Sequence, residues 1–364
     1  MKRRMIPSPR KISTITNWAL VLGGLFFAAF TSVQATPTLQ NIGYIPVSST
    51  GSVYVVDMQQ QKVLQQITNV GDHPTVLRAL PDHSKIYVDN FGPLSSQIAV
   101  IDTATNTVTK KISTNGAPFA SMQLSPDGRY LYVPTDFSVM HVIDTKTDQI
   151  IRTFSLPALP LGVEVSADGA ALYVTFIDST VGAFDALNGA VIHPKISSGG
   201  IDPGWGALSA DGRKLYLANA LSDNIAVLDT VSWKITNTIS VGIGGGPISV
   251  SLTPNSRALY VCNIGTHNIT IIDTATEKVS KVIATGTVPV VVGFNPDGSR
   301  AYLSDLGQAS IGYVPVLSVP LITIAFFAFL PGLSSDIVTY DTATSKVIGK
   351  PIITNTGPVV GLYF

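Results

Sequence analysis

One unit of sequence recurs seven times along this chain of 364 residues, and this repetition limits the possible folds more than any other feature. The run IAVIDTATNTVTKKI at 98–112 returns in similar form as ITIIDTATEKVSKVI at 269–283. An aspartate follows the apolar run in each copy, and the seven are Asp57, Asp102, Asp144, Asp185, Asp229, Asp273 and Asp341. Five of the six intervals between them span 41 to 45 residues, and the last spans 68. Repeats of this length bury a continuous core only by packing against one another.

Each unit reads as four short antiparallel strands. In LSPDGRYLYVPT at 124–135, the Pro-Asp-Gly segment predicts a tight turn between two strands. The run YLYV is apolar on both faces, as a strand packed between two neighbouring sheets must be. The fourth strand, TVTKKIST at 107–114, alternates and carries lysines, which suits a solvent-facing edge. Four strands in every 40 to 45 residues predict an all-β fold, a seven-bladed β-propeller with four-stranded antiparallel blades.

The two ends of the chain predict how the ring closes. The C-terminal GPVVGLYF at 357–364 matches an innermost strand and then stops. The segment NIGYIPV at 41–47, followed by two more strands, supplies the other three strands of a blade. The last blade is therefore expected to combine N- and C-terminal strands.

At these residues the chain resembles the YVTN-type β-propeller repeat family. The motifs are YVDN at 87–90, YLAN at 216–219 and YVCN at 260–263, together with the VIDTAT runs. The resemblance implies an exported or cell-envelope protein but no single activity. Similar propellers occur in surface-layer proteins, in a periplasmic DNA-binding protein and in haem d1 and quinone-linked dehydrogenases.

The N-terminus predicts export. Basic residues precede an apolar run at Trp18–Phe30, and Val33-Gln34-Ala35 reads as a cleavage site, so we expect a signal peptide at 1–35 and the propeller at 36–364. This places the protein in the periplasm or at the cell surface. Without residues 1–35 the chain has 18 Lys and Arg against 23 Asp and Glu, a net charge of −5. That balance gives no electrostatic footprint for nucleic acid.

The innermost strands are expected to line a central channel. Each begins at a proline on one rim, and the prolines are Pro74, Pro118, Pro160, Pro203, Pro247, Pro289 and Pro358. Counting back four residues from each turn aspartate or its equivalent gives a channel-facing ring of Arg78, Gln123, Glu164, Ala207, Ser251 and Gly293. Arg78 and Glu164 are the charges in this ring. On one interpretation they form a structural ion pair or bind water in the channel. On the other they anchor a polar ligand or a cation, with Gln123 as a further ligand-binding candidate.

Further ligand-binding candidates are predicted on the same rim, and they are His73, Asn90, Trp205, Asn219, Asn263, His267 and Asp305. Trp205 either stacks on a planar ligand or packs between blades. The remaining histidines fall elsewhere, with His83 in an opposite-rim turn and His141 and His193 in outer strands. Since no HxH, HExxH or Cys/His cluster occurs, no transition-metal site is predicted. The single cysteine, Cys262, lies in an apolar strand pattern and is expected to be buried.

These residues predict a binding or scaffold protein of the cell envelope, which presents one channel rim to a small molecule, a glycan or a protein. No catalytic residue, metal ligand or cofactor is assigned, because GxSxG and CxxCH motifs are absent. The alternatives are a metal-assisted hydrolase or lactonase-like enzyme, with Ca²⁺ held by Glu164, Asp305 and the rim asparagines, or a redox-linked propeller. Periplasmic DNA binding is the least supported alternative.

A segment at 306–335 carries no charged side chain and interrupts one blade between its second and third strands. Neighbouring antiparallel strands lie about 5 Å apart, whereas one bilayer crossing separates its ends by about 30 Å. Pro315, Pro320 and Pro331 also interrupt the apolar run at 313–333. The segment is therefore not expected to span a membrane. It is interpreted as an apolar lid or partner-docking loop, or as a site of shallow membrane contact.

Overall fold

The structure is a computed structural model, and it describes residues 40–92, 95–118, 122–306, 336–354 and 361–364. The chain divides into two units, Met1–Thr38 and Leu39–Phe364, and every described residue belongs to the second. The signal peptide predicted at 1–35 and the apolar run at 313–333 lie outside the described residues.

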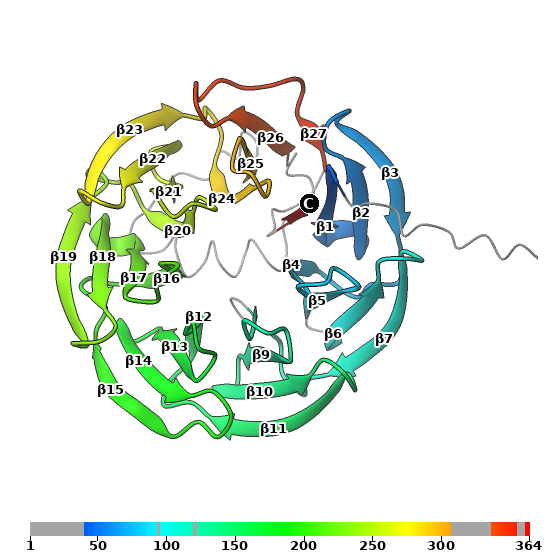
Figure 1. Cartoon of the computed structure of the whole chain (residues 1–364), viewed down its shortest axis with the longest axis horizontal. Coiled ribbons are helices and arrows are strands. Elements are labelled where there is room, and N and C mark those ends of the chain that lie inside the picture. Colours follow the sequence, from blue (N-terminus) through cyan, green and yellow to red (C-terminus); the bar gives the residue numbers. More distant parts are fainter. Residues whose placement is uncertain (1–39, 93–94, 119–121, 307–335, 355–360) are drawn as a thin grey trace, which may run out of the picture. The chain divides into compact units, whose positions relative to one another are not determined.

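Within the described residues, 28 strands form seven four-stranded antiparallel sheets, arranged as the blades of a ring (Figure 1). The predicted fold class is confirmed. Blades 1 to 3 are β28, β1, β2 and β3 (Leu362–Tyr363, Ile42–Val47, Ser52–Asp57, Lys62–Ile67), β4 to β7 (Pro74–Ala79, Lys85–Gly92, Ser95–Asp102, Thr107–Ser113) and β8 to β11 (Gln123–Leu124, Tyr130–Thr135, Val139–Asp144, Gln149–Ser155). Blades 4 to 7 are β12 to β15 (Pro160–Val165, Ala171–Phe176, Thr180–Asp185, Val191–Ser197), β16 to β19 (Pro203–Leu208, Lys214–Asn219, Asn224–Asp229, Lys234–Ser240), β20 to β23 (Pro247–Leu252, Ala258–Asn263, Asn268–Asp273, Lys278–Ala284) and β24 to β27 (Pro289–Phe294, Arg300–Asp305, Asp336–Asp341, Ile352–Ile353).

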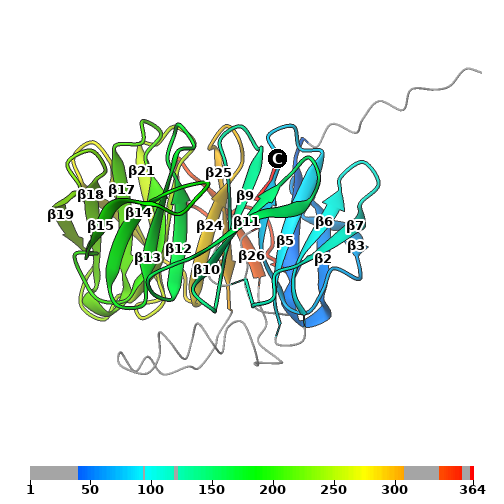
Figure 2. The ribbon, with the colours of Figure 1, turned by 90° about the horizontal axis from the view of Figure 1, so that it is seen from below.

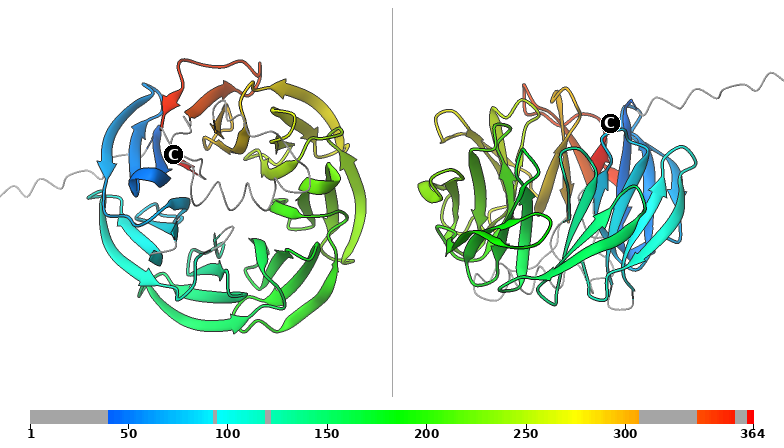
Figure 3. Two further views of the ribbon diagram at one scale, coloured as in Figure 1. Left: turned by 180° about the vertical axis from the view of Figure 1, so that it is seen from behind. Right: turned by 60° about the horizontal axis from the view of Figure 1, so that its bottom comes forward.

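The strands run between two rims, as the side view shows (Figure 2). We call the rim at which the innermost strands begin the first rim, and the rim that carries the two hairpin turns of each blade the second rim. The innermost strands of blades 2 and 4 to 7 begin at the predicted prolines and surround the axis (Figure 3). Blade 3 differs, because Pro118 makes only an isolated bridge with Thr135 and β8 is reduced to Gln123–Leu124. Pro358 lies outside the described residues.

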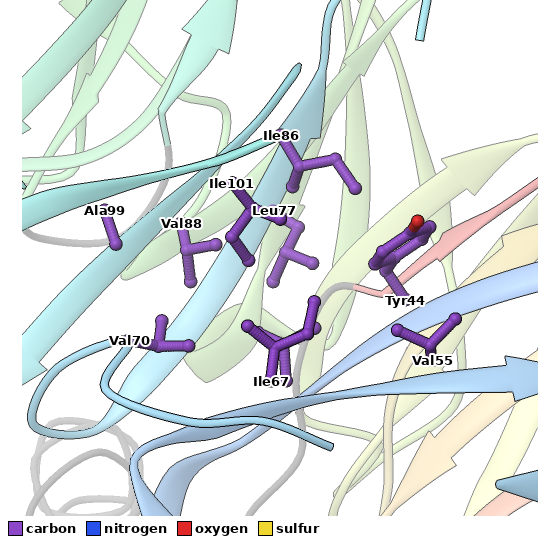
Figure 4. Close-up of a cluster of buried hydrophobic side chains, with 10 residues drawn as sticks. Tyr44, Val55, Ile67, Val70, Leu77, Ile86, Val88, Ala99 and Ile101 are labelled. Atoms are coloured by element: carbon purple, nitrogen blue, oxygen red, sulfur yellow. The ribbon is translucent and has the colours of Figure 1, made fainter. Parts of the chain in front are cut away.

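The blades are held together by apolar side chains that fill the space between neighbouring sheets. Between blades 1 and 2, Tyr44 and Val55 pack against Leu77, Ile86 and further residues of one buried cluster (Figure 4). Full burial of one such side chain stabilises the fold by about 1.5–3 kcal/mol. The second strands are therefore apolar on both faces, whereas β3 at the outer edge is almost wholly exposed.

The ring closes through the two ends of the chain, as predicted. β28 pairs antiparallel with β1, and Tyr44 lies opposite Leu362. Asn41 N also donates a hydrogen bond to Phe364 O at 2.7 Å. The ring of Tyr363 stacks on Tyr302 of blade 7 with centroids 4.3 Å apart. A strand only two residues long thus joins blade 1 to blade 7.

In several blades a residue in the last turn binds the preceding blade at the second rim, as Asn106 does in blade 2 and Asp148 in blade 3. This residue has a left-handed backbone, with φ of 52° at both Asn106 and Asp148. Tyr44 Oη donates to Asn106 Oδ1 at 2.6 Å, and Tyr87 Oη donates to Asp148 Oδ1 at 2.6 Å. Lys85 Nζ adds an ion pair to Asp148 Oδ2 at 2.7 Å. These contacts supplement the apolar packing between blades with directional bonds.

The apolar insert leaves and re-enters blade 7 at one place. β25 and β26 are antiparallel neighbours, and Asp305 lies opposite Asp336 at the ends of the insert. The position predicted from the repeat is therefore confirmed, while the role of the insert stays a prediction. In the part of the chain that the structure describes, no helix is long and apolar enough to cross a membrane.

Candidate functional site

Three side chains from the innermost strands of consecutive blades form one hydrogen-bonded chain. Arg78 Nε donates to Gln123 Oε1 at 2.9 Å, and Gln123 Nε2 donates to Glu164 Oε1 at 3.2 Å. Arg78 Nη1 also donates to Leu77 O at 2.9 Å. The amide of Gln123 thus connects a cation in blade 2 to a carboxyl group in blade 4. We call Arg78, Gln123 and Glu164 the inner triad.

The triad is half-buried, and burial opposes the charged forms of both ionisable groups. Burial lowers the pKa of Arg78, while the nearby Glu164 and Asp89 oppose this shift. Burial raises the pKa of Glu164 to about 7, and Arg78 and the bond from Gln123 offset it only in part. Glu164 therefore exchanges its proton close to neutral pH.

Asp89 is a second acidic neighbour of Arg78 that the sequence analysis missed. It is 2% exposed in β5, where its Oδ1 accepts bonds from Thr75 N, Thr75 Oγ1 and Val76 N. Burial raises its pKa to about 6, although these bonds and Arg78 act in the opposite direction. A signal was present in the sequence, because other YVTN-like runs carry Ala218 or Cys262 at this position.

The remaining ring positions carry short side chains at Ala207, Ser251 and Gly293. A Cβ on Gly293 would lie 2.4 Å from Cε2 of Tyr363, so the closing strand occupies the space beside it. Polar groups at this level of the ring are therefore concentrated on blades 2 to 4. An arginine has five N–H donors, and the bonds to Gln123 and Leu77 use two of those of Arg78. The inner triad can thus offer further donors beside a carboxyl group.

The rim asparagines predicted as ligand contacts are fully buried. Asn90, Asn219 and Asn263 are each 0% exposed. Asn263 Nδ2 donates to Asn268 Oδ1 at 2.7 Å and to Thr270 Oγ1 at 2.8 Å, within its own blade. Similarly, Asn219 Oδ1 accepts a bond from Ser198 Oγ at 2.9 Å. These contacts fix the rim loops, and a ligand contact at these positions stays untested.

Asp305 lies at the corresponding end of β25. It is 1% exposed, and its Oδ2 accepts a bond from Thr287 Oγ1 at 3.0 Å. Burial raises the pKa of Asp336 opposite it. The structure thus places two carboxyl groups at the base of the insert.

The other rim candidates belong to loops and strands of different blades. His73 in blade 2 pairs through Nδ1 with Asp72 at 2.8 Å. His267 in blade 6 has φ of 52°, and its carbonyl oxygen accepts two bonds from Thr285. Trp205 in blade 5 packs against a buried apolar cluster that includes Ile264 and Leu306. The contacts of Trp205 agree with the interpretation in which it packs between blades.

Two further predictions concern the remaining histidines and the cysteine. His141 was assigned to an outer strand, and this was wrong, because it lies in the third strand β10. There it is 7% exposed and bonded through its ring nitrogens to Thr153 Oγ1 and Thr114 O. Cys262 is 1% exposed in β21, and burial raises the pKa of its thiol to about 12. It is therefore a buried thiol, as predicted.

The glycine-rich loop at 242–246 binds a carboxylate of the same chain. Gly244 N and Gly246 N donate to the two oxygens of Asp223 at 2.8 and 2.9 Å. In the part of the chain that the structure describes, no three His, Cys, Asp or Glu residues are grouped so as to hold a metal ion. A Ca²⁺ site therefore stays a prediction.

Comparison with known proteins supports the same fold. No model of a known protein family matches the chain. Part of the chain is 29% identical over 150 residues to antigen Lp49 of Leptospira interrogans, and part is 30% identical over 118 residues to the seven-bladed beta-propeller protein Rv1057 of Mycobacterium tuberculosis. The chain is a seven-bladed β-propeller. The matches cover 37% and 31% of this chain but only 32% and 29% of the two relatives. Membership of the YVTN-type family stays a prediction.

Three solved structures resemble this propeller. A chain of Kuenenia stuttgartiensis hydrazine synthase has a TM-score of 0.64 at 22% identity, over 72% of the present chain and 89% of the hydrazine synthase chain. A protein of unknown function from Desulfotomaculum acetoxidans has a TM-score of 0.70 at 15% identity, over 89% and 99%. Dihydro-heme d1 dehydrogenase NirN, solved with DHE, has a TM-score of 0.62 at 14% identity, over 88% and 75%. At these identities the likeness concerns the fold alone.

Proposed function

We propose that this protein is an exported, non-enzymatic binding or scaffold protein of the cell envelope. In this proposal the inner triad anchors a small polar ligand, and the first rim presents a surface to an envelope protein or glycan. The apolar run at 313–333 would add a contact with a partner or with the membrane surface, and Ca²⁺ remains an optional ligand.

The observation that carries the proposal is the hydrogen-bonded chain from Arg78 through Gln123 to Glu164. Enclosing a guanidinium and a carboxyl group near the axis of the ring costs solvation free energy. Apolar side chains of similar size would fill these positions without that cost. A ligand with a negative group bound by Arg78 and a hydrogen-bond donor bound by Glu164 would offset this solvation cost.

Export and envelope location are supported by the basic and apolar segments within residues 1–35 and by the resemblance of the repeats to the YVTN-type family. The similarity to segments of antigen Lp49 and Rv1057 supports the fold but says nothing about where this protein is located. Separating the periplasm, outer membrane and medium, and detecting the protein in each, tests this part. Protein found in the cytoplasm with residues 1–35 attached would contradict it.

An enzymatic function is the second candidate, and Glu164 supports it. A carboxyl group with a pKa near 7 suits general acid–base catalysis at neutral pH. Hydrolase, lactonase-like and redox-linked activities are the forms that a propeller of this kind would take. Ca²⁺ bound in stoichiometric amount to the purified protein would favour this candidate.

A thermal-shift screen of the purified protein tests the binding function. The probes are metal ions, sugars, lactones, haems, short DNA and zwitterionic amino acids. We expect one class of small polar probe to raise the melting temperature, and Arg78→Met to abolish that rise. The matched control is Arg152→Met, because Arg152 lies in the outer strand β11. If no probe acts, or if both variants lose the effect equally, the inner triad is not a ligand site.

A further inference from the structure

We propose that the first rim of blades 3 to 6 docks a basic, apolar segment of a partner protein. The surface consists of the exposed side chains of Phe137, Ile177, Ile201 and Ile243, with the aspartates beside them. We call these four residues the apolar band. The inference extends the proposed function by naming a partner class for the first rim, and it rests on that function only in taking this rim as the binding face.

The four residues lie on rim loops that are joined to one another by hydrogen bonds. Leu156 N donates to Ser138 O, beside Phe137, and Ile177 N donates to Leu159 O at the other end of the same connection. Asp202 N donates to Ser179 Oγ at 3.2 Å, which joins the loops of Ile177 and Ile201.

The same linkage continues to blade 6. Leu221 N donates to Ile201 O at 3.2 Å. Asp223, at the end of that loop, accepts bonds from the backbone N–H groups of Gly244 and Gly246, which follow Ile243 in its loop. The loops that carry the apolar band are therefore connected to one another by hydrogen bonds. A partner that binds the band would not have to immobilise each loop separately.

The band exposes large apolar side chains on one rim. Phe137 is 69% exposed, Ile177 51%, Ile201 55% and Ile243 99%. Burying such side chains against a partner favours binding, because apolar surface is removed from water. Large apolar groups that gather on one face and are rimmed by polar residues mark interaction sites.

The charge around the band is negative on balance. The loops that carry it contain Asp136, Asp178 and Asp202 and no Lys or Arg, and Asp223 lies on the adjoining loop that bonds to those of Ile201 and Ile243. Two of these charges are balanced within the chain, since Lys195 pairs with Asp178 at 2.6 Å and glycine amides bind Asp223. Ala117 N donates to Asp136 Oδ1 at 3.0 Å, and Asp136 is exposed. Asp202 is only partly exposed, and its Oδ2 is buried. Asp136 is therefore the acidic group of this surface that a partner reaches most directly.

This combination selects the chemistry of the partner. Acidic groups beside apolar anchors complement a segment that alternates Lys or Arg with Leu, Ile or aromatic residues. An anionic lipid surface or a nucleic acid would meet negative charge, because the loops that carry the band contain no Lys or Arg and Lys195 beside them is paired with Asp178. We therefore commit to a protein segment as the occupant.

Binding of a labelled peptide of alternating Leu and Lys to the purified protein tests the proposal by fluorescence anisotropy. Each anchor that costs more than about 1.4 kcal/mol contributes about a tenfold change in affinity. We expect the Phe137→Ser/Ile243→Ser pair to weaken binding at least about tenfold. The matched control is Leu187→Ser/Val231→Ser, because these residues are 44% and 68% exposed on the second rim.

Charge is tested separately. Asp136→Asn should weaken binding and reduce its dependence on salt, because Asp136 is exposed and fewer charge pairs are then screened. A peptide with Glu in place of Lys should not bind. Arg78→Met should leave peptide affinity unchanged, so that failure of the inner triad as a ligand site and failure of the apolar band are distinguishable.

Three outcomes would overturn the proposal. Equal weakening by the first-rim and second-rim pairs would mean that peptide binding is unspecific. Binding to phosphatidylserine vesicles that depends on Phe137 and Ile243 would identify a membrane surface instead. Peptide binding that appears only after a Gly-Ser link replaces 307–335 would mean that the chain covers its own apolar band.

Discussion

The side chain of Gln61 in blade 1 is bound by the backbone of Lys350 in blade 7, which lies 289 positions later in the chain: Lys350 N donates to Gln61 Oε1 at 2.9 Å. Gln61 Nε2 donates in turn to Ile348 O at 3.0 Å. The ring is thus closed twice, once by β28 pairing with β1 near the axis and once by this amide. The second closure resembles the contacts made by Asn106 and Asp148. In all three cases a turn residue with a left-handed backbone is hydrogen-bonded to the preceding blade.

Gln61→Asn should weaken this second closure. Asparagine tolerates the left-handed backbone at φ 54° but is too short to reach both backbone groups of blade 7. Losing two bonds worth about 0.5–1.5 kcal/mol each should lower the free energy of unfolding by about 1–3 kcal/mol, measured by urea denaturation. Gln60→Asn in the same turn is the control, because Gln60 is exposed. Equal effects of the two changes would show that Gln61 does not contribute to closure.

Tyr363→Ala should open the inner closure. Tyr363 is 9% exposed, and its ring stacks on Tyr302 at 4.3 Å. Truncating a large buried aromatic side chain costs about 3–5 kcal/mol, so the melting temperature should fall and unfolding should lose cooperativity. Tyr363→Phe keeps the ring and should retain most of the stability. A variant lacking 361–364 that melts like the wild type would contradict the closure altogether.

The repeat made the fold predictable, because regularly spaced turns fix both the register and the order of the strands. Counting back from the turn aspartates placed Arg78, Gln123 and Glu164 on the innermost strands of neighbouring blades for the same reason. A departure from the repeat was not predictable in this way. The pattern predicted an innermost strand from Pro118, but β8 is described only at Gln123–Leu124.

The candidate site was predicted less completely than the fold. The repeated asparagine after YVx was interpreted as a set of ligand contacts on the first rim. In the structure these side chains are buried, and their hydrogen bonds hold the rim loops in place. Periodicity cannot distinguish a polar residue that serves the repeat from one that serves a ligand. Asp89 was missed because it stands inside a repeat motif, although it is charged where Ala218 is apolar.

Asn263→Ala should destabilise the propeller without requiring any ligand. The change removes donors to Asn268 Oδ1 and Thr270 Oγ1 in a fully buried position. Leaving buried partners unsatisfied costs about 1–3 kcal/mol each, which thermal unfolding would detect. Asn268→Ala keeps Asn263 itself and should cost less. Unchanged stability of Asn263→Ala would return this residue to the set of ligand candidates.

Stability should decrease as the pH rises towards 7. The carboxyl group of Glu164 has a pKa raised by burial from 4.5 to about 7 in the folded protein. Between these values the native state holds a proton that the unfolded state has lost, so the free energy of unfolding falls with rising pH. Glu164→Gln should flatten this slope between about pH 6 and 7.5, measured as melting temperature against pH.

Asp89, with a pKa raised to about 6, contributes a slope of the same sign at lower pH and remains in the Glu164→Gln variant. Glu277→Gln is the matched control for charge, because bonds from Lys214 and Asn237 lower the pKa of Glu277 although burial opposes this. Its titration therefore lies below the window of Glu164. A Glu277→Gln variant that flattens the same window, or a Glu164→Gln variant that leaves it unchanged, would contradict the assignment.

Removing Arg78 alone should cost more stability than removing Arg78 and Glu164 together. In Arg78→Met, the carboxyl groups of Glu164 and Asp89 lose the nearby cation that lowers the pKa of each. An uncompensated charge in a poorly solvated place is costly, whereas replacing the whole pair is often close to neutral.

The measurement is urea denaturation at pH 8, at which Glu164 is ionised in the wild type. We expect Arg78→Met to be the least stable variant and Arg78→Met/Glu164→Gln to recover part of the lost stability. Glu164→Gln alone should stay nearest the wild type, because Asp89 still faces Arg78. The difference between single and double variants should shrink at pH 6, since Glu164 then takes up a proton. A double variant that is the least stable of the three at both pH values would show that the inner triad is held by packing and not by its charges.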